Sequence, residues 1–276
     1  MRLYLSLLIL VFTLNQSKEN EKKEIVSIAD QNFLNALLEN RVDQDGDGQI
    51  SYSEAESTIA LNIGPSNIKD LSGIEAFINL DTLEMRVNPL AQPDLSSNKA
   101  LRYLALTGCG LTQLDISGNG ALRHLDCTGN EGLDSYLETL DLSGNPELEV
   151  LILPGNELTS LDLSLNPQLK SINCSRNRIQ ELDLSANLML SELRCTNNML
   201  KKLDVGLNTA LVVMVSCGNQ LSTLDISRNT GLRLIGFDNM PSITEVCVWT
   251  LPFPPDGVRV LMEFSPNAYF TTTCSN

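Results

Sequence analysis

The sequence predicts an elongated solenoid that is mostly β, built of short parallel strands, with a short helical N-terminal cap and an irregular C-terminal cap. Three observations predict this fold class. Leucines recur with a fixed period between residues 80 and 232, an acidic loop motif precedes the period, and the period is lost from residue 241 onward. Only 5% of residues are aromatic, which suits a monotonous stack better than a varied globular core.

The period is 21 residues, apart from one interval of 26. Its starts are Leu80, Leu101, Leu122, Leu148, Leu169, Leu190, Leu211 and Leu232. A unit such as residues 190–210, LSELRCTNNMLKKLDVGLNTA, consists of two half-turns of the forms LxxLxCxxN and LxxLDLSxN. Alternation within a half-turn predicts a short strand with every second residue inward, and each coil is then covered by its neighbours. The longer interval predicts a loop that bulges outward around residues 131–137.

Three kinds of residue recur along the array. The first inward position is occupied by Met85, Leu106, Cys127, Leu153, Cys174, Cys195, Ser216 and Phe237. An asparagine closes most half-turns, with Cys109 in its place in one coil, and we expect these side chains to bond the turning backbone. The third kind is a row of aspartates: Asp94, Asp115, Asp141, Asp162, Asp183, Asp204 and Asp225. That row is either a cation-seeking face or a set of solvent-facing carboxylates that bond nearby backbone and serine groups, and we favour the second interpretation.

Ahead of the array, residues 43–54 read DQDGDGQISYSE, which matches the 12-residue calcium loop of an EF-hand. The predicted Ca²⁺ ligands are Asp43, Asp45, Asp47, the Gln49 carbonyl, a water beside Ser51, and Glu54 in bidentate mode. Helical spacing of apolar residues predicts an incoming helix within 27–41 and a short outgoing helix over 53–59. An acidic turn without metal is disfavoured because its carboxylates would repel one another, and a dockerin is disfavoured because only one loop is present. We expect the ion to be a structural staple of the cap.

The first 14 residues favour export. Met1 and Arg2 precede an apolar run over 3–14, which is typical of a secretory signal and too short to span a bilayer. The formal charge of -15 disfavours nucleic acid and anionic lipid as partners. We therefore expect a secreted or cell-surface protein without stable membrane insertion once the signal is removed.

The remaining chemistry is sparse. Cys247 and Cys274 flank the C-terminal cap, and export makes a disulfide between them plausible, whereas Cys109 and Cys217 have no assigned role. His124 is the single histidine, and its neighbour Asp126 suggests an acid–base pair, but a solvated surface histidine is the favoured interpretation. We expect no enzymatic activity. Exposed Val150, Ile152, Val213 and Val215 are candidate contacts for a partner.

These units resemble the 21-residue repeats of internalin J-like leucine-rich-repeat proteins, in which a cysteine takes an inward leucine position; here that cysteine ladder is partial. The arrangement of a calcium loop before the repeats is similar to that of secreted leucine-rich-repeat proteins of bacterial surfaces. The resemblance implies a leucine-rich-repeat fold and adhesion or partner binding, and it carries over no catalytic residues.

The resulting expectation is a signal peptide over 1–17, a calcium-binding cap over 18–62, leucine-rich repeats over 63–246 and a C-terminal cap over 247–276. The expected function is a calcium-binding module for an extracellular protein or glycan ligand. Two alternatives remain open: a polysaccharide-active solenoid enzyme, and a structural component of a surface assembly.

Overall fold

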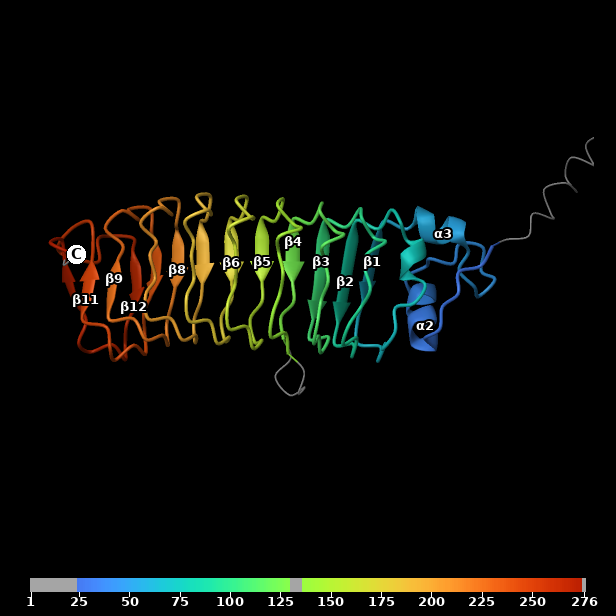
Figure 1. The fold of residues 1–276 in the computed structure, drawn as a ribbon, viewed down its shortest axis with the longest axis horizontal. Helices are drawn as coiled ribbons and strands as arrows, with labels where there is room; N and C mark the ends of the chain where they lie inside the picture. Colours follow the sequence, from blue (N-terminus) through green and yellow to red (C-terminus); the bar gives the residue numbers. More distant parts are fainter. Residues whose placement is uncertain (1–23, 130–135, 275–276) are drawn as a thin grey trace, which may run out of the picture.

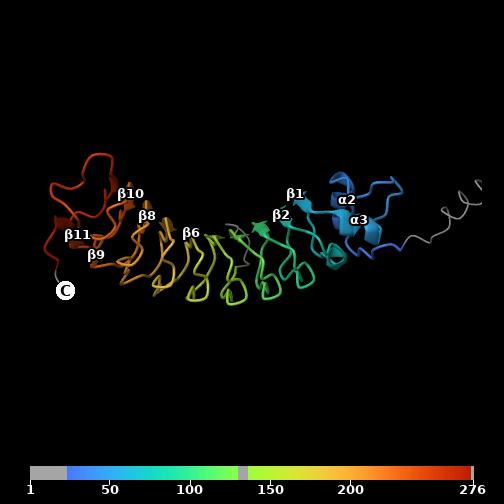
Figure 2. The same cartoon turned by 90° about the horizontal axis from the view of Figure 1, so that it is seen from above.

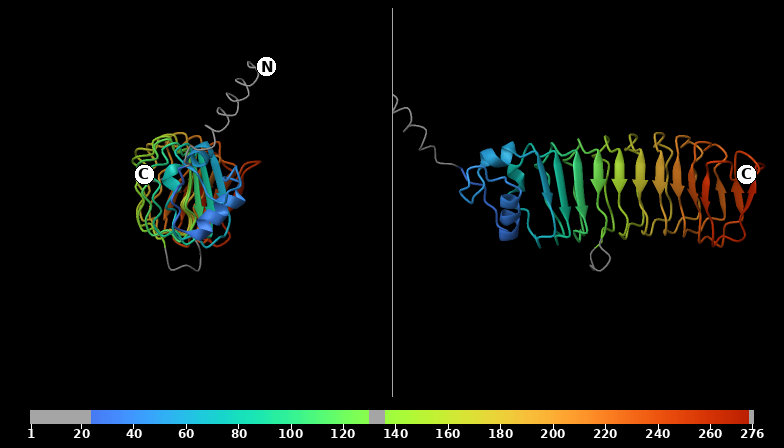
Figure 3. Two further views of the ribbon diagram at one scale, coloured as in Figure 1. Left: turned by 90° about the vertical axis from the view of Figure 1, so that its right-hand side faces the viewer. Right: turned by 180° about the vertical axis from the view of Figure 1, so that it is seen from behind.

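The structure, a computed structural model, describes residues 24–129 and 136–274. Figure 1 shows a rod of stacked coils with the helices gathered at the N-terminal end. Viewed end-on, the coils superimpose around one interior (Figure 3, left). The expected signal segment over 1–17 and most of the loop expected at 131–137 lie outside the described residues.

Ten strands form one parallel sheet along a side of the rod, in the order β1-β2-β3-β4-β5-β6-β7-β8-β10-β12. They are β1 Ala60–Ile63, β2 Thr82–Arg86, β3 Tyr103–Thr107, β4 His124–Asp126, β5 Val150–Ile152, β6 Ser171–Asn173, β7 Glu192–Arg194, β8 Val213–Val215, β10 Leu234–Gly236 and β12 Arg259–Leu261. Figure 2 shows this sheet on the inner side of a shallow arc. The sheet therefore lines the concave face of the solenoid.

The period-two alternation places the central residue of each three-residue strand from β4 to β8 in the interior. Leu104, Leu125 and Leu151 pair directly across β3, β4 and β5 and are fully buried. Burial of one such side chain contributes about 1.5–3 kcal/mol, and each coil needs its neighbours to achieve it. The predicted inward position is confirmed, because all eight of its residues, from Met85 to Phe237, are buried.

A second, three-stranded parallel sheet lies on the opposite side near the C-terminal end (Figure 2). It consists of β9 Thr223–Asp225, β11 Glu245–Cys247 and β13 Tyr269–Thr271. In the earlier coils the second half-turns follow the same path without forming named strands, apart from a bridge between Asp94 and Asp115.

Buried asparagines bind the turns of successive coils together. The Nδ2 atom of Asn177 donates to the carbonyls of Leu153 and Cys174 at 2.9 and 3.0 Å, and its Oδ1 accepts from the amide of Leu158 at 3.0 Å. Cys109 takes this place in one coil, and its thiol donates a longer bond to the Met85 carbonyl at 3.5 Å. The expectation that these side chains bond the turning backbone is confirmed.

The N-terminal end is closed by helices α2 Gln31–Glu39 and α3 Tyr52–Ser57, followed by the 3₁₀ turn η1 Ile74–Ala76. Helix α2 starts later than the 27–41 pattern suggested because Asp30 caps it. Its apolar face is buried as expected, with Phe33 and Leu37 fully covered. The long sheet begins at β1, at residue 60 rather than 63, because α3 ends at Ser57 and leaves 60–63 free to pair with β2.

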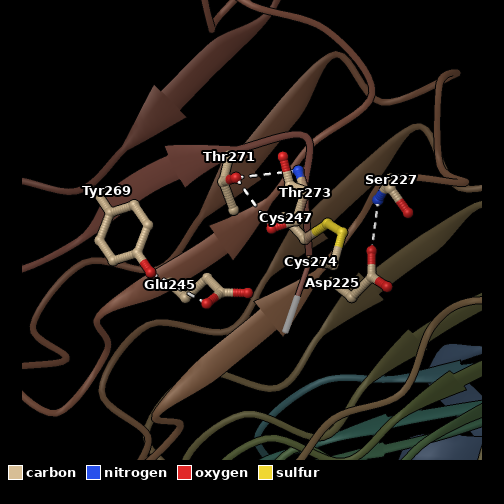
Figure 4. Close-up of a disulfide and its surroundings, with 8 residues drawn as sticks. All are labelled: Asp225, Ser227, Glu245, Cys247, Tyr269, Thr271, Thr273 and Cys274. Carbon is tan, nitrogen blue, oxygen red and sulfur yellow. Dashed lines mark hydrogen bonds between the residues drawn. A yellow bond between two sulfur atoms is a disulfide. The ribbon is translucent and has the colours of Figure 1, made fainter. Parts of the chain in front are cut away.

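The C-terminal end differs from the irregular cap expected over 247–276. Strands β12 and β13 extend both sheets by one more coil, and Phe253 packs on Phe270 with ring centroids 4.8 Å apart. Cys247 and Cys274 form a disulfide, as predicted, which ties the end of the last coil to β11 (Figure 4). The segment is thus a further coil held by a cross-link.

Among the described residues, none of the helices combines the length and apolar character needed to cross a bilayer.

Candidate functional site

The acidic loop brings its three aspartates together. Carboxylate oxygens of Asp43, Asp45 and Asp47 all lie within 4.8 Å of one another. Calcium binds oxygens at about 2.3–2.6 Å, so a single ion can lie between oxygens at this separation. The loop is pre-shaped by its own backbone, because Asp43 accepts hydrogen bonds from the amides of Gly46 and Gly48 at 2.7 and 2.8 Å. The donor chemistry of this cluster fits a hard divalent cation.

Glu54, predicted at loop position 12, is not part of that carboxylate cluster. Its Oε1 accepts from the Gln44 amide at 2.9 Å, and its Oε2 accepts from the amide and the hydroxyl of Ser51 at 2.8 and 2.6 Å. Ser51 is the N-cap of α3, so the two residues form a capping box. Bidentate binding of an ion by Glu54 would replace these bonds.

The loop is joined to a short extended segment that precedes α2. The Val26 amide donates to the Ile50 carbonyl at 2.8 Å, and the Tyr52 amide donates to the Glu24 carbonyl at 3.1 Å. The side chain of Ile50 is buried. The end of the loop, residues 50–52, is thus paired with residues 24–26. Sequence reasoning missed that pairing, because the helical spacing was read from residue 27 onward and residues 24–26 were assigned to no element.

Asp30 joins the helical cap to the first coil. One carboxylate oxygen accepts from the Asn32 amide at the start of α2, and the other accepts from the Lys69 and Asp70 amides at 2.8 and 3.3 Å. Burial raises the pKa of Asp30, but backbone hydrogen bonds led by that of Lys69 outweigh it, so the pKa lies below its usual value. Sequence reasoning did not single out Asp30; an aspartate at the start of the helical pattern was the signal that could have indicated its capping role, but not its bonds to Lys69 and Asp70.

The concave sheet carries two outward rows of side chains. One row contains Val150 and Val213, and the other contains Ile152 and Val215, all of them partly exposed as predicted. Between these two apolar pairs, Arg194 donates to Glu192 at 2.6 Å. The face therefore has two apolar areas separated by one polar and charged area on β6 and β7. Leu234, paired with Val213, extends the second apolar area and was not anticipated.

His124 does not form the acid–base pair considered above. Its ring stacks on Tyr103 with centroids 4.2 Å apart and an interplanar angle of 11°. Burial lowers the pKa of His124, which favours the neutral imidazole at pH 7. Asp126 instead accepts from the amide and the hydroxyl of Thr128 at 2.8 and 2.6 Å. In the described part of the chain the histidine and the aspartate thus have different contact partners.

The aspartate row makes the backbone hydrogen bonds expected of it. Each carboxylate accepts a hydrogen bond from the amide two residues on, as Asp115 does from Ser117 at 2.9 Å. Bonds from the hydroxyl and the amide of Ser117 lower the pKa of Asp115. The hydrogen bonds that the favoured interpretation predicts are therefore confirmed.

Comparisons with known proteins agree with this architecture. No protein-family model and no curated protein sequence matches the chain. The functional domain of internalin J from Listeria monocytogenes, which includes a cysteine ladder, is 25% identical with a TM-score of 0.62, over 88% of this chain and 62% of that one. The chain thus spans less than two thirds of that domain.

Two further solved structures share the fold alone. Internalin C2 from Listeria monocytogenes is 22% identical with a TM-score of 0.62, over 79% of this chain and 93% of that one. A leucine-rich-repeat protein of Leptospira interrogans is 16% identical with a TM-score of 0.56, over 79% and 67% of the two chains. The protein is therefore a leucine-rich-repeat solenoid whose structural neighbours are internalins and other leucine-rich-repeat proteins.

Proposed function

We propose that this chain is an extracellular protein-binding module that contacts its partner through the concave sheet. The observation that carries the proposal is the pair of apolar areas on that sheet, Val150 with Ile152 and Val213 with Val215. Strand spacing of about 4.8 Å places the two areas roughly 14 Å apart. Partly exposed apolar side chains are candidate contacts for a protein partner, and arginine, here Arg194 between the two areas, is enriched at protein interfaces. The likeness to internalin J supports the same inference.

Calcium is part of the proposal as a structural ion. Asp43, Asp45 and Asp47 would hold it, with the Gln49 carbonyl, a water beside Ser51 and Glu54 completing the oxygen set. Support comes from the loop sequence and from the closeness of the three carboxylates. The ion would rigidify the loop that pairs with residues 24–26, and thereby the cap that covers the first coil.

The binding proposal is tested with the variant Val150→Asp/Val213→Asp on an array of purified extracellular proteins and glycans. A matched control is Leu165→Asp/Leu207→Asp, because Leu165 and Leu207 are 56% and 55% exposed outside the long sheet. We expect the protein to bind one or a few proteins on the array, the sheet variant to lose them, and the control to keep them. Loss in both variants, or binding to glycans alone, would contradict the proposal.

A further inference from the structure

A groove runs over the N-terminal coils on the side of the second half-turns. Two hollows, of about 450 and 730 Å³, lie side by side, because Gln92, Pro93 and Asp94 line both of them. The residues 92–94, 113–115 and 139–141 contribute the same positions from three successive coils to the larger hollow. The groove therefore runs along the rod, across the coils.

The floor of the groove is apolar and partly open to solvent. It consists of Pro93, Leu114 and Leu140, which are partly exposed. In the later coils the equivalent Leu161 and Leu182 are only 6% and 7% exposed. The groove thus offers a strip of partly exposed apolar side chains, whereas the equivalent leucines of the later coils are buried.

Acidic groups dominate the charged lining of the groove. The two hollows contain five carboxylates and one ammonium group: Asp70, Glu75, Asp94, Asp115, Asp141 and Lys69. Further along the same side, the hollow at residues 180–204 contains Lys201 and Lys202 beside its carboxylates. Five carboxylates against one lysine thus line the N-terminal hollows, whereas three carboxylates against two lysines line the hollow at residues 180–204; the hollow between them, with Asp162, Glu181 and Asp183, is also acidic.

The three row aspartates of the groove use only part of their hydrogen-bonding capacity. Asp94, Asp115 and Asp141 each engage Oδ1 with the amide two residues on, at 2.9–3.0 Å. In the described part of the chain their Oδ2 atoms have no hydrogen bond to protein. The bond from the Ser143 amide, with that from its hydroxyl, lowers the pKa of Asp141, and Asp115 and Asp162 repel its charge. A bound cation would relieve that repulsion.

We propose that this groove binds an extended segment of a partner protein rich in lysine or arginine. Charge complementarity selects the partner: cationic groups would meet the Oδ2 atoms of Asp94, Asp115 and Asp141. The apolar floor accommodates the aliphatic stems of lysine and arginine or an intervening apolar side chain. An extended chain suits a groove that is open at its surface and crosses several coils. This surface is separate from the concave sheet.

The test is fluorescence anisotropy with labelled hexalysine and the full chain, in calcium sufficient to saturate the cap. The groove variant is Asp94→Asn/Asp115→Asn/Asp141→Asn, and the matched control is Asp162→Asn/Asp183→Asn/Asp204→Asn. Asparagine keeps the Oδ1 acceptor, and both variants lose three charges from the same row. We expect the groove variant to weaken binding about tenfold and the control about twofold or less.

Three results would overturn the proposal. Equal weakening of hexalysine binding in both triple variants would show that the peptide responds to net charge alone. Unchanged binding in the groove variant would show that the peptide does not bind in the groove. Binding of an uncharged chitohexaose, lost in the groove variant in the absence of any peptide binding, would identify a glycan groove instead. Circular dichroism of each variant confirms that the coils remain folded.

Discussion

The Oδ2 atom of Asp30 accepts a hydrogen bond from the backbone amide of Lys69 at 2.8 Å, across 39 residues of sequence. The same carboxylate caps helix α2 through its other oxygen. One side chain thus fixes both the start of the helix and its attachment to the first coil. The N-terminal cap and the solenoid are coupled through this residue.

Asp30→Ala should lower the free energy of unfolding by about 1–3 kcal/mol, because it removes a helix cap and the attachment to Lys69. The pKa of Asp30 is lowered in the folded protein. Its contribution is therefore complete above the ordinary value of 3.8 and is lost as pH falls through the lower folded pKa. Urea unfolding of wild type and variant at pH 7 and in the acid range measures this. If the difference in unfolding free energy between wild type and variant did not change with pH, the ionised form of Asp30 would not be what stabilises the cap.

Calcium should raise the midpoint of thermal unfolding by about 5–10 °C at a concentration near 100 times the Kd. Asp43→Ala/Glu54→Gln should abolish this increase, because it removes ligands at both ends of the loop. Since both residues also bond the loop backbone, the informative quantity is the difference with and without calcium. Glu56→Gln, an exposed charge change in α3, is the control. Calorimetry should find one site in the wild type, and an unchanged calcium response in the double variant would exclude the staple.

Asn177→Ala should cost about 2–4 kcal/mol of stability, because the buried Leu158 amide loses its hydrogen-bond acceptor. The interior carbonyl of Leu153 also loses a donor. Asn173→Ala, in the partly exposed outward row of the same coil, removes one bond from the Ser175 amide at 3.2 Å and should cost no more than about 1 kcal/mol. Denaturant titration of the two variants gives the comparison. Equal losses of stability in the two variants would mean that the buried hydrogen bonds of Asn177 contribute no more than the contacts of a partly exposed asparagine.

The inward cysteines should resist alkylation in the native protein. Burial raises the pKa of Cys174 to about 12 and that of Cys195 above its usual range, so neither forms an appreciable thiolate at pH 8. Cys217 is partly exposed, although burial also raises its pKa. Iodoacetamide followed by mass spectrometry should modify Cys217 first and slowly. Rapid modification of the inward cysteines would show that the coils open.

Cys247→Ala/Cys274→Ala should destabilise the last coil by about 3–4 kcal/mol, since the disulfide closes a loop with a sequence separation of 27 residues. This coil has neighbours on one side only. Hydrogen exchange should therefore accelerate in β12 and β13, while β5 and β6 remain protected. Uniform acceleration along the rod would show that the array unfolds as one unit.

The repeated part of the fold was predictable because one residue pattern recurs at a fixed interval. Leu104, Leu125 and Leu151 occupy equivalent positions in sequence, and the structure pairs them directly. The last coil was missed because residues 249–258 interrupt the spacing with three prolines. Strand β12 pairs with β10 across 25 residues and lacks the leucine pattern.

The candidate sites were predictable to different degrees. The aspartates at 43, 45 and 47 follow a fixed local spacing, so their closeness could be predicted from sequence. The pairing of residues 24–26 with the loop, the role of Asp30, and the groove at Pro93 depend on contacts between segments or on surface shape. A single sequence does not specify which segments meet, so these features required the structure.

The strands lie across the rod, so the main-chain hydrogen bonds that join one coil to the next run along its length (Figure 1). A force that pulls the two ends apart would load these bonds in series, and coils would detach one after another from a terminus. Detachment would begin at the N-terminal cap, which contains the acidic loop, or at the last coil, which the Cys247–Cys274 disulfide cross-links. The mechanical resistance of the rod is therefore set by its two ends: the force at which the first coil unfolds depends on the N-terminal cap and on the disulfide of the last coil.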